Sequence, residues 1–305
     1  MFNLGEPVAP ASSVEMQEGF ARLSRGAYFK EASLDITLSL LTESAGQITG
    51  IERVSIWALA DGGRELRCLE LYERSRGQHS SGVRLAASRY PAYFKALQAG
   101  DAIVADDAYL HPATAGFAAD YLPRHNILAM LDTPIHIRGD LQGVLCFEQV
   151  GSRHPWSPVH RLFAHAVANL VTLALVEYEA GEAKRQAQHA NERLRAVFDA
   201  SRDAMVLADG ESGLILDVNR QAERLFGGGR LDLIGRHQRQ LHPLAEEERC
   251  AREFRKAVEG ESVTPVRTLI RCLDGGSVPV EITAEVADVE GRRLALGIFR
   301  RLDGT

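Results

Sequence analysis

Residues 162–197 read LFAHAVANLVTLALVEYEAGEAKRQAQHANERLRAV, and this stretch decides how the chain is organised. A single heptad phase runs through it in alternating steps of four and three residues, on Leu162, Ala166, Asn169, Leu173, Val176, Ala180, Ala183, Ala187, Ala190, Leu194 and Val197. Asn169 is the only polar member of this stripe. Such a pattern is typical of a helix that pairs with a second helix in a left-handed seam. We therefore expect one long helix here.

The same helix carries a second apolar stripe on Phe163, Val167, Leu170 and Ala174, which can pack on a neighbouring sheet. The sequence thus predicts two interfaces on one helix. The first is a parallel homodimer seam formed by Leu162, Asn169, Leu173, Val176, Leu194 and Val197. The alternative is a single amphipathic helix that packs only on its own domain.

Length and composition describe a multidomain globular protein. The chain has 305 residues, which favours two domains, and 45% hydrophobic residues with 25% charged residues let each half bury a core. A net charge of −6 argues against a non-specific nucleic-acid binder. We find no secretory signal and no window of about 18 apolar residues, so we expect a cytoplasmic protein with no membrane contact. The four cysteines lie far apart, which favours reduced thiols.

The first half alternates helical and strand patterns. Helical spacing dominates residues 14–51, and strands are predicted at 53–60, 64–72, 129–138 and 141–150, with short helical patterns at 90–99 and 114–121 between the two pairs. Asp61-Gly62-Gly63 and Gly139-Asp140 predict the hairpin turns. This order predicts helices packed on an antiparallel sheet.

The second half repeats this order on a smaller scale. Short strands at 204–208 and 214–218 precede a helix at 219–226, for which Asn219 is the expected N-cap. Short helical turns run to residue 259, and strands at 266–273, 278–289 and 292–299 follow. We expect a five-stranded antiparallel sheet beside a pocket.

Both halves resemble known families. FDASRDAMVLADGESGLILDVNRQAERLFG (198–227), LIGR (233–236), LHP (241–243) and DGGSVPVEITAEV (274–286) resemble a PAS domain. RVSIW (53–57), YPAYFKAL (90–97), IVADDAYLHPAT (103–114), YL (121–122) and LDTPIHIRGDLQGVLCFEQVG (131–151), with the helix at 156–176, resemble a GAF domain. The resemblance is to the input halves of bacterial histidine kinases and diguanylate cyclases, and it implies sensing of a small molecule or relay of a rearrangement within a dimer.

The chain departs from these families at three places. Many relatives carry a histidine where this chain has Gln149 and an acid where it has His160. The sequence ends GIFRRLDGT, without the Asp-Ile-Thr-like exit turn of PAS domains that drive an output. We expect either a chain without a C-terminal effector or the sensory part of a longer protein.

Ligand pockets are expected in both domains. In the GAF-like half the candidates are Trp57, Tyr93, Phe94, Asp106, Asp107, Tyr109, Tyr121, Met130 and Phe147. The alternative is that these aromatics form core and the acids cap a short helix. In the PAS-like half the candidates are Met205, Phe226, Leu241, His242, Phe254, Leu269, Ile282 and Leu296. His242 is the candidate for a haem ligand or a hydrogen bond to a ligand, and its alternative is a satisfied turn residue.

The sequence gives no support for a metal site, a covalently bound cofactor or a catalytic motif. No cysteine pair has zinc-finger spacing, and His160 and His165 are five residues apart, so no metal is expected. No cysteine stands where a bilin or flavin adduct would form, and the cofactor stays unknown. We find no phospho-accepting histidine with an ATP-binding domain, no Gly-Gly-Asp/Glu-Glu-Phe loop and no Glu-Ala-Leu segment. The chain is therefore expected to have no catalytic residues and no enzymatic activity.

Together these patterns predict an α+β protein with two antiparallel-sheet sensor domains joined by a coiled-coil helix. The expected parts are a disordered N-terminus (1–14), a GAF-like domain (15–176), a coiled-coil linker (177–197) and a PAS-like domain (198–305). The predicted function is a cytoplasmic signal-transduction sensor that relays a change through a dimeric helix to a downstream kinase or cyclic-di-GMP enzyme. The alternative is the sensory N-terminal part of a histidine kinase or diguanylate cyclase.

Overall fold

The computed structural model describes residues 13–26, 33–261 and 265–302. The chain divides into two compact units, residues 1–184 and 185–305. Helix α6 (Pro158–Ala200) contributes residues to both units. Two antiparallel sheets with this helix between them in the sequence confirm the predicted fold class.

The first unit is built on a seven-stranded sheet. Its path is β3-β2-β1-β7-β6-β5, and β4 pairs with β2. The strands are β1 (Arg53–Ala60), β2 (Glu65–Glu73), β3 (Gln78–Ser80), β4 (Arg84–Ala86), β5 (Ile103–Ala105), β6 (Ile127–Ile137) and β7 (Asp140–Val150). Neighbouring strands on this path are antiparallel, and the 3-10 turn η1 (Asp61–Gly63) joins β1 to β2.

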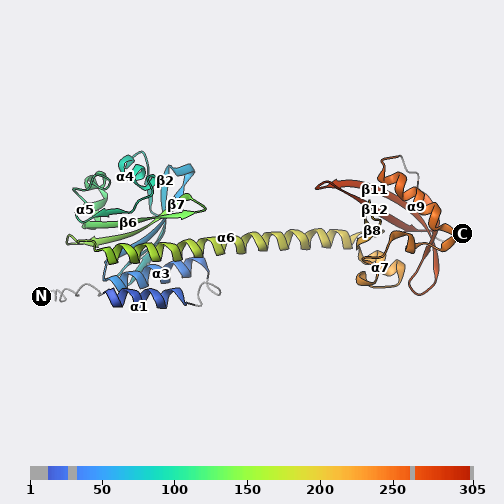
Figure 1. Cartoon of the computed structure of the whole chain (residues 1–305), viewed down its shortest axis with the longest axis horizontal. Coiled ribbons are helices and arrows are strands. Elements are labelled where there is room, and N and C mark those ends of the chain that lie inside the picture. Colours follow the sequence, from blue (N-terminus) through green and yellow to red (C-terminus); the bar gives the residue numbers. More distant parts are fainter. Residues whose placement is uncertain (1–12, 27–32, 262–264, 303–305) are drawn as a thin grey trace. The chain divides into compact units, whose positions relative to one another are not determined.

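Helices cover both faces of this sheet (Figure 1). On one face lie α1 (Ser13–Ser24), α3 (Leu34–Thr49) and the first half of α6. On the other lie α4 (Pro91–Gln98), η2 (Ala115–Ala119) and α5 (Tyr121–His125). Because both faces are covered, central strands such as β6 are buried along most of their length, and the unit has two separate cores.

The two stripes of α6 differ in exposure. Phe163, Val167 and Leu170 of the second stripe are buried against the sheet, as expected, and the ring of Phe163 lies 6.4 Å from that of Phe147. The large apolar residues of the heptad stripe point away from this core. Leu162 is 68% exposed and Leu173 is 45% exposed. Unit 1 therefore buries only one of the two stripes.

The second unit is a five-stranded antiparallel sheet with helices on one face. The strand order is β10-β11-β12-β8-β9. The strands are β8 (Ala204–Asp209), β9 (Ile215–Val218), β10 (Val266–Arg271), β11 (Ser277–Val289) and β12 (Arg292–Arg301). The helices are α7 (Arg220–Phe226), α8 (Arg230–Leu233), η3 (Gln238–Leu241) and α9 (Leu244–Val258).

Asn219 joins three elements of this unit. Its Oδ1 accepts the backbone N–H of Ala222, as the predicted N-cap of α7, and also that of Met205 in β8, both at 2.9 Å. Its Nδ2 donates to the carbonyls of Phe198 at 3.1 Å and Asp203 at 3.0 Å. The side chain is fully buried, so these groups have no water to replace it.

Three details differ from the sequence-based expectations. Strands β3, β4 and β5 were not predicted, since three-residue strands carry too little pattern. Helix α9 has 15 residues where only short turns were expected. Helix α1 begins at Ser13, inside the segment expected to be disordered, and residues 1–12 lie outside the described residues. Helix α6 runs without a break through residues 176 and 197, so the domain boundaries expected there stay predictions.

The first part of α6 also changes one expectation about membranes. By length and composition alone it could cross a membrane, the one such helix among those described, although no apolar window of that length was expected. Core helices of soluble proteins pass the same test. Here Phe163, Val167 and Val171 are buried in the core of unit 1, which explains the apolar composition.

The Asn219→Ala substitution should destabilise the second unit by about 3 kcal/mol, because it removes the acceptor of two backbone N–H groups and the donor to two part-buried carbonyls. Urea unfolding of the full chain followed by circular dichroism measures this change. Asn191→Ala, at an exposed position of α6, is the matched control with an effect near zero. Equal stability of the Asn219→Ala and Asn191→Ala variants would show that the Asn219 hydrogen bonds add nothing.

Candidate functional site

The second unit contains a cavity between the inner face of its sheet and the η3–α9 segment. Its volume is about 70 Å³. The wall is formed by Val206, Ala208, Gln238, Leu241, His242, Cys250, Glu253, Phe254, Val266, Ile282, Ala284, Ala295, Gly297 and Phe299. A single water needs roughly 10–15 Å³ on the same measure, so the cavity has room for roughly five or six groups of that size.

Small residues create this room. Ala208, Ala284, Ala295 and Gly297 occupy inward positions on three neighbouring strands, where larger side chains would fill the space. The opposite wall carries the ring of Phe254 from α9. The cavity is therefore mostly apolar, with its polar groups at the η3–α9 end.

His242 is the main polar group on the wall. The side chain is 4% exposed, and Nδ1 makes a long hydrogen bond of 3.4 Å to the carbonyl of Leu269. If Nδ1 donates to this carbonyl, Nε2 is the acceptor of the neutral ring. Burial lowers the pKa of His242 below its usual 6.5, against a smaller upward effect of the Leu269 carbonyl, so the ring is neutral at pH 7. Gln238 adds a buried amide beside it.

Four of the eight residues predicted for this pocket line its wall: Leu241, His242, Phe254 and Ile282. Met205 and Leu296 lie on strands of the wall but on the outer face of the sheet, because their neighbours Val206 and Ala295 point inward. Leu269 is 43% exposed. Phe226 is fully buried in the core, 5.5 Å from the ring of Phe299, and does not reach the wall.

Most wall residues that were not predicted lie on the inward face of the strands. Val206, Ala208, Ala295 and Gly297 alternate with the chosen positions, so a strand read one residue out of phase gives the wrong face. The small residues of β11 and β12 were the available signal. Cys250 and Glu253 come from α9, which was not predicted as a helix of this length.

The first unit has a much smaller cavity, of about 10 Å³, which holds roughly one water. Its wall is formed by Trp57, Leu66, Leu85, Tyr93, Phe117, Tyr121, Met130, Cys146 and Glu148. Trp57, Tyr93, Tyr121 and Met130 were predicted here. Phe117 of η2 packs 4.8 Å from the ring of Tyr93 and takes up space that a ligand would need.

The other residues predicted for this pocket lie elsewhere. Phe94 is buried in the same core but off the wall, and Tyr109 packs against that core from outside. Phe147 faces the opposite side of the sheet, toward α6. Asp106 accepts the backbone N–H of Trp156 at 2.9 Å. Asp107 accepts the backbone N–H of Tyr109 and pairs with Arg153. Both acids therefore stabilise loops and do not line the cavity.

Two buried carboxyl groups stand at this smaller cavity. Glu148 pairs with Arg53 at 2.8 Å and accepts the hydroxyl of Tyr121 at 2.9 Å. Although burial lowers the pKa of Arg53, Glu148 holds it above its usual value, so the Arg53 guanidinium stays charged. Asp132 has no cation beside it. It accepts the hydroxyl of Tyr93 at 2.9 Å, and its Oδ1 has no partner among the described residues.

Burial, with the nearby charge of Glu148, raises the pKa of Asp132 to about 8. Asp132 is therefore mostly protonated at pH 7. Because the folded protein binds this proton more tightly than the unfolded chain, the contribution of Asp132 to stability is present at low pH and is lost as pH rises toward 8.

None of the described residues forms a group of three or more histidine, cysteine, aspartate or glutamate side chains placed to hold a metal ion. Each of the four cysteines is buried and unpaired. Burial raises the pKa of Cys68 to about 12, which keeps this thiol protonated at neutral pH.

Comparison with known families agrees with the two folds. The family model for the GAF domain matches residues 33–175, and a family model for the PAS domain matches residues 202–300. The chain thus consists of two sensory domains. It is a GAF–PAS protein, in which the GAF domain comes first.

Individual relatives are distant. An uncharacterized protein of Azorhizobium caulinodans is 27% identical over 194 residues, which are 61% of this chain and 25% of that protein. The chain therefore spans about a quarter of the length of this curated relative. The GAF domain of a phosphoenolpyruvate-protein phosphotransferase from Coxiella burnetii is 18% identical, with a TM-score of 0.47, over 57% of this chain and 99% of that one. A PAS domain from Colwellia psychrerythraea is 29% identical, with a TM-score of 0.34, over 37% of this chain and 96% of that one.

The Asp132→Asn substitution should stabilise the protein increasingly as pH rises, because it replaces a carboxyl that must stay neutral with an amide of the same shape. We expect the gap in unfolding free energy between variant and wild type to widen by ~1 kcal/mol or more between pH 5 and pH 8. Urea unfolding followed by tryptophan fluorescence measures it, since Trp57 and Trp156 both lie in unit 1. Asp140→Asn, at an exposed turn, is the control. A gap that is constant with pH contradicts a neutral Asp132.

Proposed function

We propose that this chain is a cytoplasmic sensor without enzymatic activity, which binds a small molecule in its PAS cavity and relays the change through helix α6 of a parallel homodimer. GAF and PAS domains are sensory domains, which supports the general role. The observation that carries the relay is the exposed heptad stripe of α6. Leu194 is 71% exposed and Val197 is 74% exposed in unit 2, although both are large and apolar.

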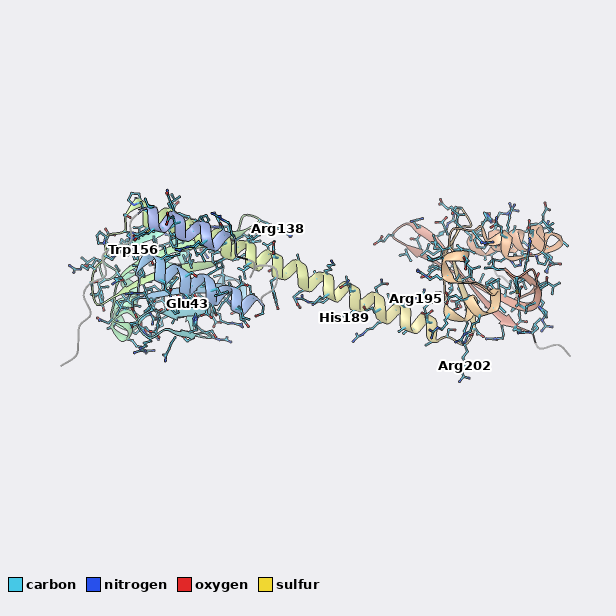
Figure 2. The ribbon with its side chains drawn as sticks, turned by 90° about the horizontal axis from the view of Figure 1, so that it is seen from below. Glu43, Arg138, Trp156, His189, Arg195 and Arg202 are labelled. Carbon is cyan, nitrogen blue, oxygen red and sulfur yellow. The ribbon has the colours of Figure 1, made fainter. Side chains whose placement is uncertain are left out.

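The seam explains this exposure. The stripe continues from Leu162 to Val197 in one helical phase through residues of both units. Figure 2 shows the side chains of the second half of α6, such as His189, extending from the ribbon. A second copy of the helix would bury the stripe at ~25 cal/mol per Å² of apolar surface. In such a dimer Glu179 of one chain and Lys184 of the other occupy facing g and e positions, at a gain of ~0.5 kcal/mol.

The middle of the seam suits a relay. Ala180, Ala183, Ala187 and Ala190 bury little surface, so this segment would hold the two helices together least strongly. Asn169 at a seam position would fix the register at some cost in stability. A ligand shifts such a dimer only through a difference in affinity between its two arrangements.

The cavity limits the chemistry of the ligand. Its size admits a compact molecule, and a haem or a flavin has several times as many atoms as the space allows. The acceptor of neutral His242 favours a ligand hydroxyl or amine. Glu253 on the wall disfavours an anion. We infer an uncharged, mostly apolar molecule with one hydrogen-bond donor. The cavity over the GAF sheet has room for roughly one water, and we infer that this domain acts as a structural and relay module.

A second candidate function is the sensory part of a larger histidine kinase or diguanylate cyclase. The match to a quarter of a longer protein from Azorhizobium caulinodans favours it. The two readings share the site and the relay, and differ in whether the effector lies on the same chain. Sequencing the gene beyond the codon for Thr305 separates them.

The double variant Leu173→Lys with Leu194→Lys should be monomeric, because each dimer would hold four lysines in its seam. Light scattering of the full chain measures the mass. Tyr178→Lys with Gln188→Lys adds the same charge at exposed positions outside the heptad stripe and should stay dimeric. A dimeric seam variant, or a monomeric wild type, rules out the seam.

Cyclopentanol, a compact molecule with one hydroxyl donor, serves as a probe of the cavity. At ten times its dissociation constant it should raise the free energy of unfolding by ~1.4 kcal/mol. Ala295→Phe fills the cavity and should abolish this gain, while Leu296→Phe, on the outer face of the same strand, should keep it. Urea unfolding with and without cyclopentanol measures both. A gain that survives Ala295→Phe places the cyclopentanol elsewhere.

A further inference from the structure

Helix α6 begins with a reciprocal pair of hydrogen bonds. Ser157 precedes the first helical residue, and its Oγ accepts the backbone N–H of His160 at 3.3 Å. In return, Nδ1 of His160 accepts the backbone N–H of Ser157 at 3.2 Å, and it also lies 3.0 Å from the Ser157 Oγ. This is the arrangement of a capping box, in which glutamate or glutamine is the usual residue at the position of His160. Here the acceptor is an imidazole, which can take up a proton.

The other ring nitrogen of His160, Nε2, takes no part in the capping box. His160 is 7% exposed, and its Nε2 is buried without a hydrogen-bond partner in the described part of the chain. Since Nδ1 accepts from Ser157, the proton of the neutral ring sits on Nε2. Only the neutral ring can accept the Ser157 N–H, because a protonated Nδ1 can bond Ser157 only by donating to its Oγ.

A second histidine stands beside the first. The ring centre of His154 lies 4.9 Å from that of His160, and its Nε2 is also buried without a partner among the described residues. Between them in sequence is Trp156, labelled beside the start of α6 in Figure 2. Its Nε1 donates to the carbonyl of Ala105 at 3.2 Å, and its backbone N–H donates to Asp106 at 2.9 Å. These bonds fix the chain that enters the helix.

The charges around the cap keep His160 neutral at pH 7. Burial, and then the neighbouring His154, lower the pKa of His160 below 6.5. Burial lowers the pKa of His154 and Asp106 raises it. The ion pair of Arg153 with Asp107 is the next charged group along the entering loop. Helices α1 and α3 contribute apolar side chains to the core they share with α6.

We propose that Ser157 and His160 form a proton-sensitive cap, and that protonation of His160 opens the first turn of helix α6. An imidazolium has two donors and no acceptor, so it cannot receive the Ser157 N–H. Its positive charge also faces the positive end of the helix dipole. Because the folded pKa is the lower one, the cap is complete above about pH 6.5 and is lost as pH falls through the folded pKa of His160, which lies below that value. This device does not depend on the ligand or on the dimer seam.

Amide hydrogen exchange of the full chain, resolved to single residues by fragmentation and corrected for intrinsic rates, tests the cap. Between pH 7.5 and a pH one unit below the measured pKa of His160, the protection of the Ser157 and His160 amides should fall roughly fivefold, the effect of losing one N-cap. His160→Gln keeps an acceptor that does not titrate, so its protection should stay constant. The His154→Gln variant should still lose protection of these amides, but at a higher pH, since His154 lowers the pKa of His160.

Two results overturn the proposal. One is equal protection of the wild type at both pH values, and the other is the same loss in His160→Gln. Exchange of the imidazole C2 hydrogen of wild-type His160 between pH 5 and pH 8 gives its pKa without any variant. This pKa should coincide with the midpoint of the amide transition, and a difference of more than one unit also overturns the cap. The transition should be unchanged by EDTA, and a change would mean that a bound metal, rather than a proton, controls the helix end.

Discussion

Helix α6 carries two apolar stripes, and the described part of the chain buries only one of them. The stripe of Phe163, Val167 and Leu170 is buried against the sheet of unit 1, where Phe147 receives it. The heptad stripe is left in solvent at Leu162, Leu194 and Val197. Burial of apolar surface is the main favourable term in association, so this uncovered stripe is the feature that a relay between two copies would use.

The two domains differ in the size of their interior side chains and therefore in the size of their cavities. Unit 1 places Phe117 and two tyrosines over its sheet and leaves space for roughly one water. Unit 2 places alanine and glycine on β11 and β12 and leaves several times that space. The buried ion pair of Arg53 with Glu148 joins strands β1 and β7 of unit 1, while the cavity of unit 2 keeps its polar groups at one end. The PAS half is thus the better candidate for a ligand, and the GAF half for a structural and relay module.

Much of the fold could be predicted from the sequence because its signals are local. The Asp-Gly and Gly-Gly turns mark the hairpins, and Asn219 marks the start of α7. The sites were harder, since a strand read one residue out of phase exchanges Met205 for Val206 and Leu296 for Ala295. Phe147 was placed on the wrong face for the same reason. Contacts between distant segments, such as Tyr93 with Asp132 or the close approach of Gly143 to Trp57, leave no local pattern.

The arrangement of α6 in the dimer is tested most directly by a disulfide across the seam. Ala187 occupies an a position in the weakly packed middle, where equivalent Cα atoms of a parallel, in-register pair come within reach of a disulfide. The full-length Ala187→Cys variant should oxidise to a covalent dimer, and Gln188→Cys, one residue outside the seam, should not. Equal cross-linking of the two variants, or none in either, would contradict a parallel α6 seam.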